Sequence, residues 1–503
     1  DVAKHSVPLI TKLSTGAWFT SRISAAGLFH VIYWRPLSPE VKKSLRTYVF
    51  GCVNSFRMFA SLCGDETPMV RRAACASIGK LAKVMDYAHV KADLFPCFIK
   101  LTKDEQDSVR LLTVDNVVLI AQTIQHSDNV RTELSQCFQT SLTLPIIFEL
   151  CVDKSWRVRY KVADKFCELC ASVGNQTESK ADELIDGFVR LLQDTEAEVR
   201  TAAAFKVGGK RKSLVAKSIG GPLTLRKLIN PVKQLTKDPS QYTRAALGSV
   251  IMSIANVLTK KDAFEHLVPL FLLLLKDSHP EVRLNIISKL DSVNKVCGCR
   301  SPPKVIGVDV LSQSLLPAIL ELANDKKWRV RLAIIQHIPT LAQQLGHEFF
   351  EQKLSDLCFN WLGDSVYSIR EAATTNLTKL SEVFGAQWAR AHIIPKITNL
   401  GGHKSYLYRM TALFAITVTD MAKSVGQQLT TEKLLPVIVR LASDVVPNVR
   451  FNVAKSLGLV TQFISSEAID QSVLPALNKL SQDSDPDVAF FAAESVKKIS
   501  SKS

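Results

Sequence analysis

The sequence predicts an all-α fold, a superhelix of about twelve stacked helix pairs, and three observations support this prediction. The first is a recurring pattern in which an Asp is followed five residues later by a β-branched residue and then by Arg. The second is the spacing of the copies, because five of the eleven intervals between them are 39 residues and three are longer by nine or ten. The third is a proline that stands eight residues before the Asp position in eight of the twelve copies.

Self-similarity at this period is typical of an alpha solenoid of HEAT or armadillo repeats. Such a solenoid grows by stacking, so residues 1–503 are expected to form a single domain despite their number. The complete copies of the pattern lie at Asp65/Arg71, Asp104/Arg110, Asp153/Arg159, Asp194/Arg200, Asp277/Arg283, Asp325/Arg331, Asp364/Arg370 and Asp444/Arg450. Weaker copies lie at Gly16/Arg22, Asp238/Arg244, His403/Arg409 and Asp483/Ala489.

Each repeat is expected to contain two helices joined by a short turn. The first helix runs from the proline to the Asp, as in residues 315–323, where apolar residues recur at i, i+3, i+4 and i+7. Proline suits the first turn of a helix, because its missing N–H would have no intrahelical partner there. The Asp then lies in the turn, where its carboxylate can accept backbone N–H groups and favour the start of the second helix.

The second helix opens near the β-branched residue, which should point into the core. The Arg that follows lies about 100° further around the helix, where it can reach the Asp of a neighbouring repeat. We therefore expect a structural Asp/Arg ladder along the turns, formed by the pairs of residues given above. The copies with His403 in place of Asp and with Ala489 in place of Arg should be weak rungs of this ladder.

The three long intervals locate insertions between repeats, at about residues 49–61, 127–143 and 297–304. These insertions could be surface loops or translated introns, and the sequence leaves both interpretations open. Gly208 and the basic run after it interrupt the second helix of the fifth repeat, and Gly220 follows. The chain begins as a repeat helix without the polar outer face of a terminal repeat, so we expect further repeats before Asp1.

Composition limits the compartment and the partners. Hydrophobic residues make up 47% of the chain, but the longest apolar run is nine residues, so no membrane insertion is expected. Eleven cysteines without regular spacing fit a reducing cytoplasmic or nuclear compartment. The net charge of +16 would attract acidic surfaces, although no nucleic acid partner is expected. Nine Lys or Arg and no acid lie between Thr201 and Lys237, which we interpret as a solvated loop and helix face.

No motif predicts an enzyme, a metal site or a cofactor. The run after Gly208 lacks the Gly-x4-Gly-Lys-Ser/Thr order of a phosphate-binding loop. Cys167 and Cys170 form a lone Cys-x2-Cys in a predicted helix, which is better interpreted as two small core residues than as metal ligands. Cys297 and Cys299 are similar but are expected to be more exposed. What the repeats do offer is a row of turns that can present side chains to a partner.

Large side chains occupy these turns, among them Trp18, Pro68, Trp156, Trp328 and Tyr367. Trp, Tyr and Arg contribute most strongly to binding at protein interfaces, although a turn Trp can also simply cap its own helix pair. At these turns the sequence resembles the HEAT-repeat scaffold (A) subunit of protein phosphatase 2A. The segments that carry the resemblance are residues 17–22, 67–74, 105–112, 153–160, 281–288, 311–317 and 449–455, in order along nearly the whole chain.

The resemblance implies a chain equivalent to the fourth to fifteenth repeats of that family, with a regulatory B-type subunit on residues 1–300 and the phosphatase catalytic subunit on residues 311–503. It implies that the catalytic-subunit-binding residues are Lys327, Trp328, Arg329, Val366, Tyr367, Tyr406, Pro447 and Asn448. It implies that the regulatory-subunit-binding residues are Trp18, Glu66, Pro68, Arg71, Arg72, Ser155, Trp156 and Arg157. The expected function is that of a non-catalytic scaffold that joins the two subunits.

The main departure from the family is charge, since its members are typically acidic and this chain is basic. The charge therefore favours an alternative, a basic HEAT-array adaptor of the tubulin-binding or transport-receptor-like kind. In that alternative the turn residues would contact an acidic protein surface.

Overall fold

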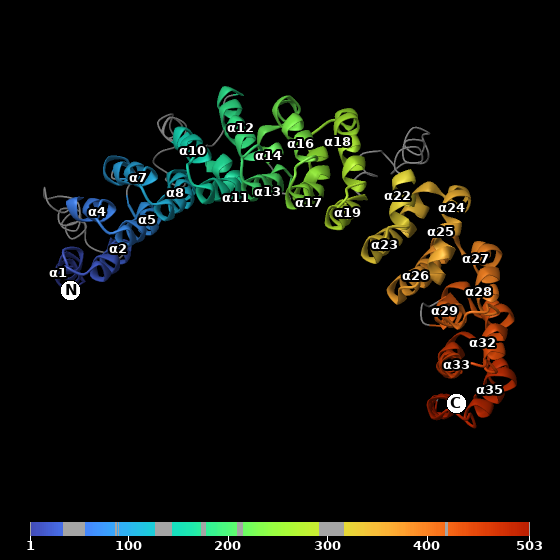
Figure 1. Ribbon diagram of the computed structural model, residues 1–503. Coiled ribbons are helices and arrows are strands. Elements are labelled where there is room, and N and C mark those ends of the chain that lie inside the picture. Colours follow the sequence, from blue (N-terminus) through green and yellow to red (C-terminus); the bar gives the residue numbers. More distant parts are fainter. Residues whose placement is uncertain are drawn as a thin grey trace. The chain divides into compact units, whose positions relative to one another are not determined.

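The computed structural model describes residues 2–33, 56–85, 88, 90–125, 143–172, 178–208, 215–290, 316–417 and 421–501. These residues form helices and turns, and no β-strand occurs among them, so the predicted all-α HEAT-repeat fold is confirmed. The chain divides into two compact units, Asp1–Val296 and Cys297–Ser503, each built from helix pairs (Figure 1). The insertions near 127–143 and 297–304, with Cys297 and Cys299, lie almost entirely outside the described residues.

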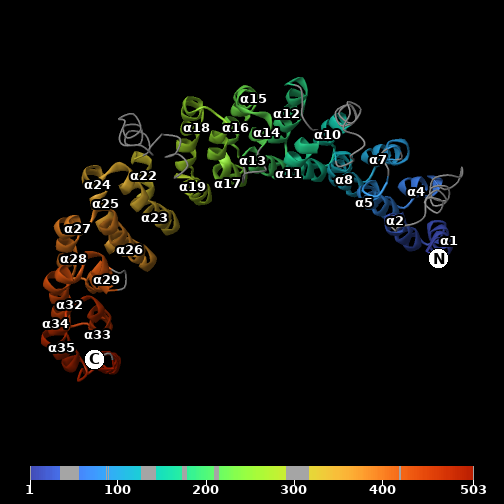
Figure 2. The same ribbon diagram turned by 180° about the vertical axis from the view of Figure 1, so that it is seen from behind.

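In the first unit the first helices of the pairs are α1 (Val2–Ser14), α4 (Phe56–Cys63), α7 (Phe95–Thr102), α10 (Leu144–Cys151), α12 (Glu178–Leu192), α16 (Ile229–Leu235) and α18 (Lys260–Leu275). The second helices are α2 (Phe19–Tyr33), α5 (Pro68–Ala82), α8 (Asp107–Gln125), α11 (Trp156–Ser172), α13 (Ala197–Val207), α17 (Gln241–Val250) and α19 (Pro280–Ile287). Each second helix packs against its own first helix, and from α2 to α17 each also packs against the second helix of the next pair, as both views of the ribbon show (Figures 1 and 2).

The second unit repeats this arrangement. Its first helices are α22 (Leu316–Ala323), α25 (Ser355–Asn360), α28 (Ile394–Leu400), α32 (Leu435–Leu441) and α35 (Leu474–Leu480). Its second helices are α23 (Trp328–Leu345), α26 (Tyr367–Phe384), α29 (Tyr406–Thr417), α33 (Pro447–Val460) and α36 (Pro486–Ser500). Short helices join successive pairs, namely α24 (His347–Lys353), α27 (Ala386–His392), α30 (Met421–Val425), α31 (Gln427–Leu429), α34 (Ser466–Ala468) and the 3-10 helix η10 (Thr461–Phe463). A further 3-10 helix, η8 (Trp361–Gly363), follows α25 within its pair.

The β-branched residue of the repeat pattern lies in the core, as predicted. Ten of these side chains are fully buried, namely Val70, Val109, Val158, Val199, Thr243, Val282, Val330, Ile369, Val449 and Val488. Burying a valine or isoleucine side chain stabilises the fold by roughly 1.5–3 kcal/mol, so this one position contributes to the core of nearly every repeat.

The proline is the second residue of α7, α10, α22, α28, α32 and α35, so its predicted place in the first turn is confirmed there. In several repeats a π-helical segment leads directly into the helix, because the residue with no N–H cannot continue the regular hydrogen-bond ladder. These segments are η2 (Val90–Leu94), η9 (Thr430–Leu434) and η11 (Ile469–Val473), while η5 (Thr224–Leu228) precedes α16. Pro8 and Pro269 lie inside α1 and α18, so the prediction that the first helix starts at the proline was wrong there.

The predicted insertion at 49–61 has other bounds in the structure, whereas the predicted interruption at Gly208 is confirmed. The insertion expected at 49–61 ends before Phe56, because residues 56–63 form α4 with Phe59 and Leu62 in the core. The interruption at Gly208 is confirmed, since α13 ends at Val207 and Gly208 takes an extended conformation. An added Cβ at Gly208 would overlap the Val250 carbonyl oxygen, so the chain passes too close there for a larger residue. The short helices α14 (Val215–Ile219) and α15 (Gly221–Leu223) follow, and the 3-10 helix η6 (Ile251–Asn256) extends α17.

The turns are joined by an Asp/Arg ladder. In each rung the Nε and Nη2 atoms of an Arg donate to the two carboxylate oxygens of the Asp in the next repeat, with Nε to Oδ2 distances of 2.5–3.0 Å. Such a two-point pair is among the stronger hydrogen-bonded ion pairs in proteins. The rungs are Arg22–Asp65, Arg71–Asp104, Arg110–Asp153, Arg159–Asp194, Arg200–Asp238, Arg244–Asp277, Arg331–Asp364, Arg409–Asp444 and Arg450–Asp483.

Both partners also fasten their own turns. Arg71 Nη1 donates to the carbonyl oxygens of Asp65 and Glu66, and Arg283 and Arg370 hold their turns in the same way. Asp65 Oδ1 accepts the N–H of Thr67, the residue that precedes the second helix. Neither side chain of any of the nine rungs is more than 15% exposed, so water competes weakly for these bonds.

The ladder lowers the pKa of several of its carboxyl groups. Partial burial alone would raise the pKa of Asp104, Asp194, Asp277 and Asp444, but hydrogen bonds from the Arg and from a backbone N–H outweigh it and hold the pKa below its usual value. The ionised form is therefore the one that the folded chain favours.

Replacing Arg331 with Ala should destabilise the second unit. The change leaves the largely buried Asp364 without its two-point partner and frees the carbonyl of Asp325, which should cost about 2–4 kcal/mol. Thermal unfolding followed by circular dichroism should show a melting temperature lower by several degrees. The exposed neighbour Arg329, replaced by Ala, is the matched control, and an equal effect of the two changes would count against the ladder.

Acid should weaken the fold through the same carboxyl groups. Because their folded pKa is lowered, their contribution to stability is present above the unfolded value of about 4 and is lost as the pH falls through the folded pKa. The melting temperature should stay nearly constant from about pH 7 to 5 and fall below about pH 4. Asp444→Asn, which cannot titrate, should melt lower at neutral pH and lose less on acidification. A variant curve parallel to the wild-type curve would contradict this explanation.

Candidate partner-binding ridge

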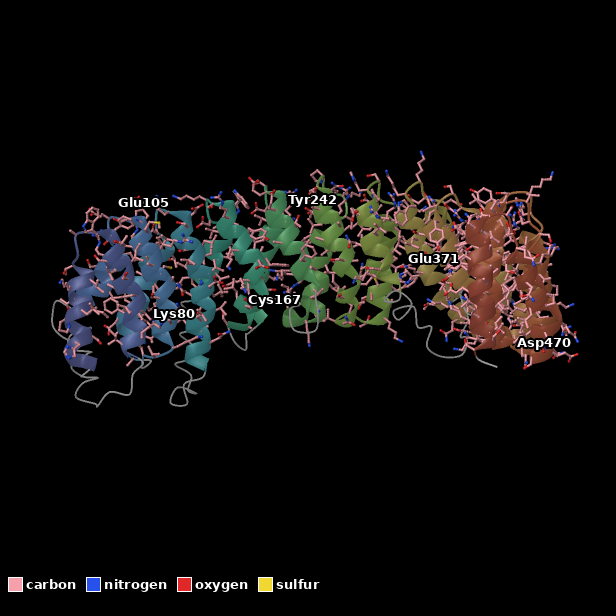
Figure 3. The ribbon with its side chains drawn as sticks, turned by 90° about the horizontal axis from the view of Figure 1, so that it is seen from below. Lys80, Glu105, Cys167, Tyr242, Glu371 and Asp470 are labelled. Carbon is pink, nitrogen blue, oxygen red and sulfur yellow. The ribbon has the colours of Figure 1, made fainter. Side chains whose placement is uncertain are left out.

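The turns present their side chains along one edge of each unit. The position three residues after the Asp begins or precedes each second helix, and it faces outward because the buried residue lies two positions later. Glu105 and Tyr242 lie on this edge of the first unit, whereas Lys80 and Cys167 lie away from it (Figure 3). We call these turn residues the ridge of each unit.

In the second unit the ridge begins with Lys327, Trp328 and Arg329. The N–H of Lys327 donates to Asp325 Oδ1, which fixes the start of α23. Trp328 is the first residue of that helix and is 36% exposed. The guanidinium of Arg329 lies 5.3 Å from the centre of the Trp328 ring, a cation–π arrangement that covers one side of the indole. The turn therefore offers a preformed aromatic and basic surface.

Val366, Tyr367 and Tyr406 occupy the equivalent place in the next two repeats. The N–H of Val366 donates to Asp364 Oδ1, and Tyr367 and Tyr406 are the first residues of α26 and α29. Both tyrosines are exposed. The Tyr367 ring packs edge-on against Phe414 at 6.1 Å, which limits its rotation.

Pro447 and Asn448 open α33 and are exposed. Asn452 Nδ2 donates to the carbonyl oxygen and to the side-chain oxygen of Asn448, so the asparagine is held in place. Val445, in the same turn, is 87% exposed and was not predicted as a ridge residue. An apolar side chain exposed to that extent adds binding area to this part of the ridge.

In the first unit, some of the predicted regulatory-subunit-binding residues are exposed, and others are hydrogen-bonded within the chain. Trp18 is 77% exposed, and Glu66, Pro68 and Arg72 are exposed as well. Arg71 was predicted for both the ladder and the regulatory ridge, but its three nitrogens all donate within the chain. Its place is therefore in the ladder, and Arg72 is the cation that this turn presents to solvent.

The turn of the fourth repeat is tied to the repeat before it. Ser155 Oγ donates to Asp107 Oδ2, and Arg157 Nη1 lies 3.8 Å from the same oxygen. Arg157 also lies 5.7 Å from the centre of the exposed Trp156 ring. Trp156 and Trp328 thus share one local structure, a turn Trp with the following Arg against its face.

Tyr242 is a ridge residue that the sequence analysis missed. It is 70% exposed at the second position of α17, in a repeat with Thr243 at the usual valine position. Extending the rule of a large side chain in the turn to the weaker copies of the pattern would have found it. Met69, beside Pro68, is exposed in the same way.

Part of the basic run between Thr201 and Lys237 is neutralised by acids of earlier repeats. Lys206 pairs with Asp164, Arg226 with Asp182, and Lys227 with Asp186. These pairs join neighbouring repeats rather than forming a free cationic patch. Residues 209–214 of the run lie outside the described part of the chain.

The described residues contain no group of three or more His, Cys, Asp or Glu side chains that could hold a metal ion. Cys170 is buried in α11, and Cys167 is half-buried, with burial raising the pKa of Cys167 to about 11. That pKa disfavours the thiolate that metal binding requires. In the same part of the chain no helix combines the length and apolar character needed to cross a membrane.

Comparisons with known proteins identify the relatives of this solenoid. The family described as PPP2R1A-like HEAT repeat matches residues 177–259, the HEAT repeat family matches residues 56–85, 143–173 and 434–464, and the PIK3R4-like middle domain matches residues 228–345. The beta isoform of the human 65 kDa regulatory (A) subunit of serine/threonine-protein phosphatase 2A is 46% identical over 292 residues, which are 58% of this chain and 45% of that protein. The chain is homologous to the scaffold (A) subunits of protein phosphatase 2A.

Other relatives carry the same description. The regulatory (A) subunit of protein phosphatase PP2A from Schizosaccharomyces pombe is 43% identical over 174 residues, which are 35% of this chain and 26% of that protein. The protein phosphatase 2A scaffold subunit of Dictyostelium discoideum is 47% identical over 92 residues, 18% of this chain and 14% of that one. The matches thus span less than half the length of these relatives.

Solved structures share the fold at low sequence identity. Importin beta superposes with a TM-score of 0.59 at 12% identity, over 98% of this chain and 65% of the other. Kap121p bound to Nup53p superposes with a TM-score of 0.55 at 12% identity, over 96% of this chain and 48% of the other. These structures support the HEAT solenoid, while the identity to the phosphatase 2A scaffolds distinguishes this chain among such solenoids.

Proposed function

We propose that this chain is a non-catalytic scaffold of the serine/threonine protein phosphatase 2A holoenzyme. The ridge of the second unit would bind the phosphatase catalytic subunit, whereas the ridge of the first unit would bind an exchangeable regulatory B-type subunit. The observation that carries the proposal is the 46% identity to the human beta isoform of the phosphatase 2A scaffold over 292 residues. The exposed aromatic residues of the turns support it.

The geometry of the ridge suits protein binding for a thermodynamic reason. Trp328 and Tyr367 bring large contact areas and few rotatable bonds, and each is already held by a neighbouring ring or guanidinium. Ordering such side chains on association costs little conformational entropy, so more of the contact energy appears as affinity. Trp, Tyr and Arg are also the residue types that most often contribute strongly at interfaces.

In this proposal the chain contributes position rather than chemistry. Its relatives are named as regulatory or scaffold subunits, so the catalytic groups would come from the bound phosphatase subunit. The stacked repeats would set the distance between the two partners, and thereby which substrates reach the phosphatase. We place this assembly in the cytoplasm and nucleus, where the free cysteines of the chain would stay reduced.

Trp328→Ala should weaken binding of the phosphatase 2A catalytic subunit by about 2 kcal/mol or more, because it removes a preformed aromatic anchor. Isothermal titration calorimetry of the full chain with purified catalytic subunit measures the change in binding free energy. Trp156→Ala is the matched control, since it removes the same side chain with the same Arg partner from the first unit. Equal loss for both variants, or for neither, would argue against the assignment of the two ridges.

A basic adaptor for an acidic protein surface is the second candidate, because the net charge of +16 favours it. Co-sedimentation with microtubules, whose surface is acidic, separates the two. The scaffold proposal expects no co-sedimentation at physiological salt, where surface charges are screened beyond about 8 Å. Saturable co-sedimentation under those conditions, lost on Trp328→Ala, would support the adaptor instead.

A further inference from the structure

One rung of the ladder is incomplete in the second unit. Arg370 Nη1 donates to the carbonyl oxygens of Asp364 and Ser365, at 2.8 and 3.1 Å, as in the other repeats. The position that should supply the carboxylate is His403. Nε and Nη2 of Arg370 have no acceptor within residues 316–417 and 421–501, although the rungs on either side, Arg331–Asp364 and Arg409–Asp444, are complete.

An Asp at this position would accept both a backbone N–H of its own turn and the guanidinium of the preceding repeat, and His403 does only the first. Its Nδ1 accepts the N–H of Ser405 at 3.1 Å, so the turn keeps its shape. Its ring packs on Tyr408, with centres 4.1 Å apart. An imidazole cannot supply the two oxygens that the edge of a guanidinium needs, so among the described residues of the second unit Nε and Nη2 of Arg370 have no acceptor.

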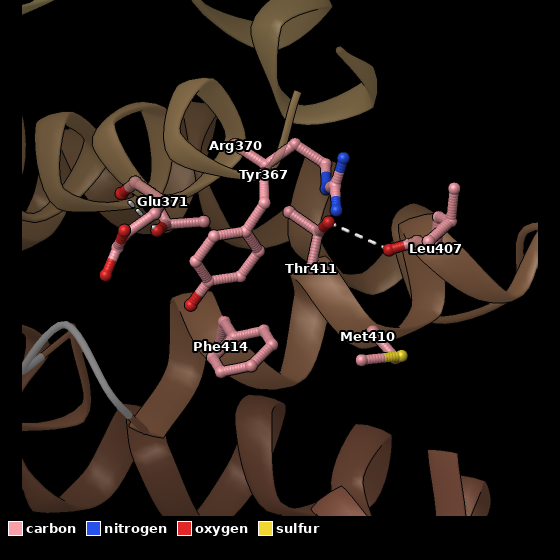
Figure 4. A pocket seen from close by; sticks show the side chains of 8 residues that line it. Tyr367, Arg370, Glu371, Leu407, Met410, Thr411 and Phe414 are labelled. Carbon is pink, nitrogen blue, oxygen red and sulfur yellow. Dashed lines mark hydrogen bonds between the residues drawn. The ribbon is translucent and has the colours of Figure 1, made fainter. Parts of the chain in front are cut away.

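A pocket lies at this incomplete rung, between α26 and α29 (Figure 4). Its volume is about 40 Å³, several times the roughly 10–15 Å³ that one water needs. Apolar and aromatic side chains form much of the wall, and the guanidinium of Arg370 lies 5.8 Å from the centre of the Tyr367 ring. The lining residues are Tyr367, Arg370, Glu371, Thr374, Leu407, Met410, Thr411 and Phe414.

The chemistry of the pocket selects one kind of occupant. A guanidinium with two adjacent free donors matches a carboxylate, and the apolar walls strengthen the attraction by excluding water. Glu371 also lines the pocket, and its charge would repel a doubly charged phosphate more strongly than a single carboxylate. The pocket therefore favours an Asp or Glu side chain that approaches on the Arg370 side.

We propose that this pocket receives an Asp or Glu side chain of the phosphatase catalytic subunit. The carboxylate of the partner supplies the acceptor that His403 lacks, so the partner completes the ladder. This inference rests on the proposed function, and the pocket is continuous with the ridge because Tyr367 belongs to both.

His403→Asp tests the proposal, because it provides the missing carboxylate within the chain. The aspartate should pair with Arg370 as in the other rungs, which should raise the melting temperature of the free chain by about 2–5 °C. The same aspartate should block the pocket and weaken binding of purified catalytic subunit by a factor of about ten or more. Arg370→Ala should weaken binding to a similar extent without the stability gain.

His403→Asn is the matched control. Like Asp, it can accept the N–H of Ser405 and it removes the contact with Tyr408, but it carries no charge. It should bind the catalytic subunit with wild-type affinity and should lack the stability gain of His403→Asp. The gain should also vanish when His403→Asp is combined with Arg370→Ala, which shows whether the new carboxylate acts through that guanidinium.

The outcomes separate this inference from the proposed function. If the wild-type chain binds the catalytic subunit, Trp328→Ala weakens binding, and His403→Asp and Arg370→Ala bind as tightly as the wild type, the pocket proposal alone fails. If the wild-type chain does not bind the catalytic subunit, both fail. Weaker binding by both pocket variants, with His403→Asn unaffected, supports the carboxylate site.

Discussion

The two-point bond between an Arg and the Asp of the next repeat is the interaction on which the rest of this structure depends. In each of the nine rungs, one edge of the guanidinium holds carbonyl groups of its own turn, and the other edge holds the next turn through its carboxylate, as Arg71 does. The carboxylate in turn fixes the N–H of the residue that precedes the second helix. A single side-chain type therefore closes each turn and sets its distance from the following one.

This arrangement explains how one short stretch can serve both the fold and a partner. In residues 325–331 the buried Val330 and the ladder residues Asp325 and Arg331 hold the turn in place. The residues between them, Lys327, Trp328 and Arg329, have no role in the core and stay exposed. Because the turn is rigid, its exposed residues can differ from repeat to repeat without loss of structure. His403 is the exception, since there the ladder itself changes and an open guanidinium results.

The helix pairs, the buried Val position and most of the Asp/Arg ladder could be predicted from the sequence, because they depend on the spacing of residues within one repeat. An Asp six residues before an Arg, repeated at about the same interval, is enough to place both on one edge, and the buried Val between them follows from helix geometry. Features that depend on the neighbouring repeat were harder to predict. Arg71 was predicted both as a ladder residue and as a regulatory-subunit contact, and only its acceptors in two turns show that all three of its nitrogens are engaged within the chain. Lys206 pairs with Asp164 of the preceding repeat, which the basic run itself does not reveal. The start of α4 depends on how its side chains pack against neighbouring helices. The π segments depend on the backbone hydrogen bonds before the proline, and the spacing of the repeat residues does not specify either feature.

We propose that the turns of the second unit are a preformed surface for the phosphatase catalytic subunit. Hydrogen–deuterium exchange of the full chain, with and without the purified catalytic subunit, tests it most directly. If the catalytic subunit binds these turns, peptides that cover residues 325–331, 364–370 and 403–409 should exchange more slowly in its presence, with little change in the first unit. Slower exchange confined to the first helices of the repeats, or to the turns of the first unit, would contradict it.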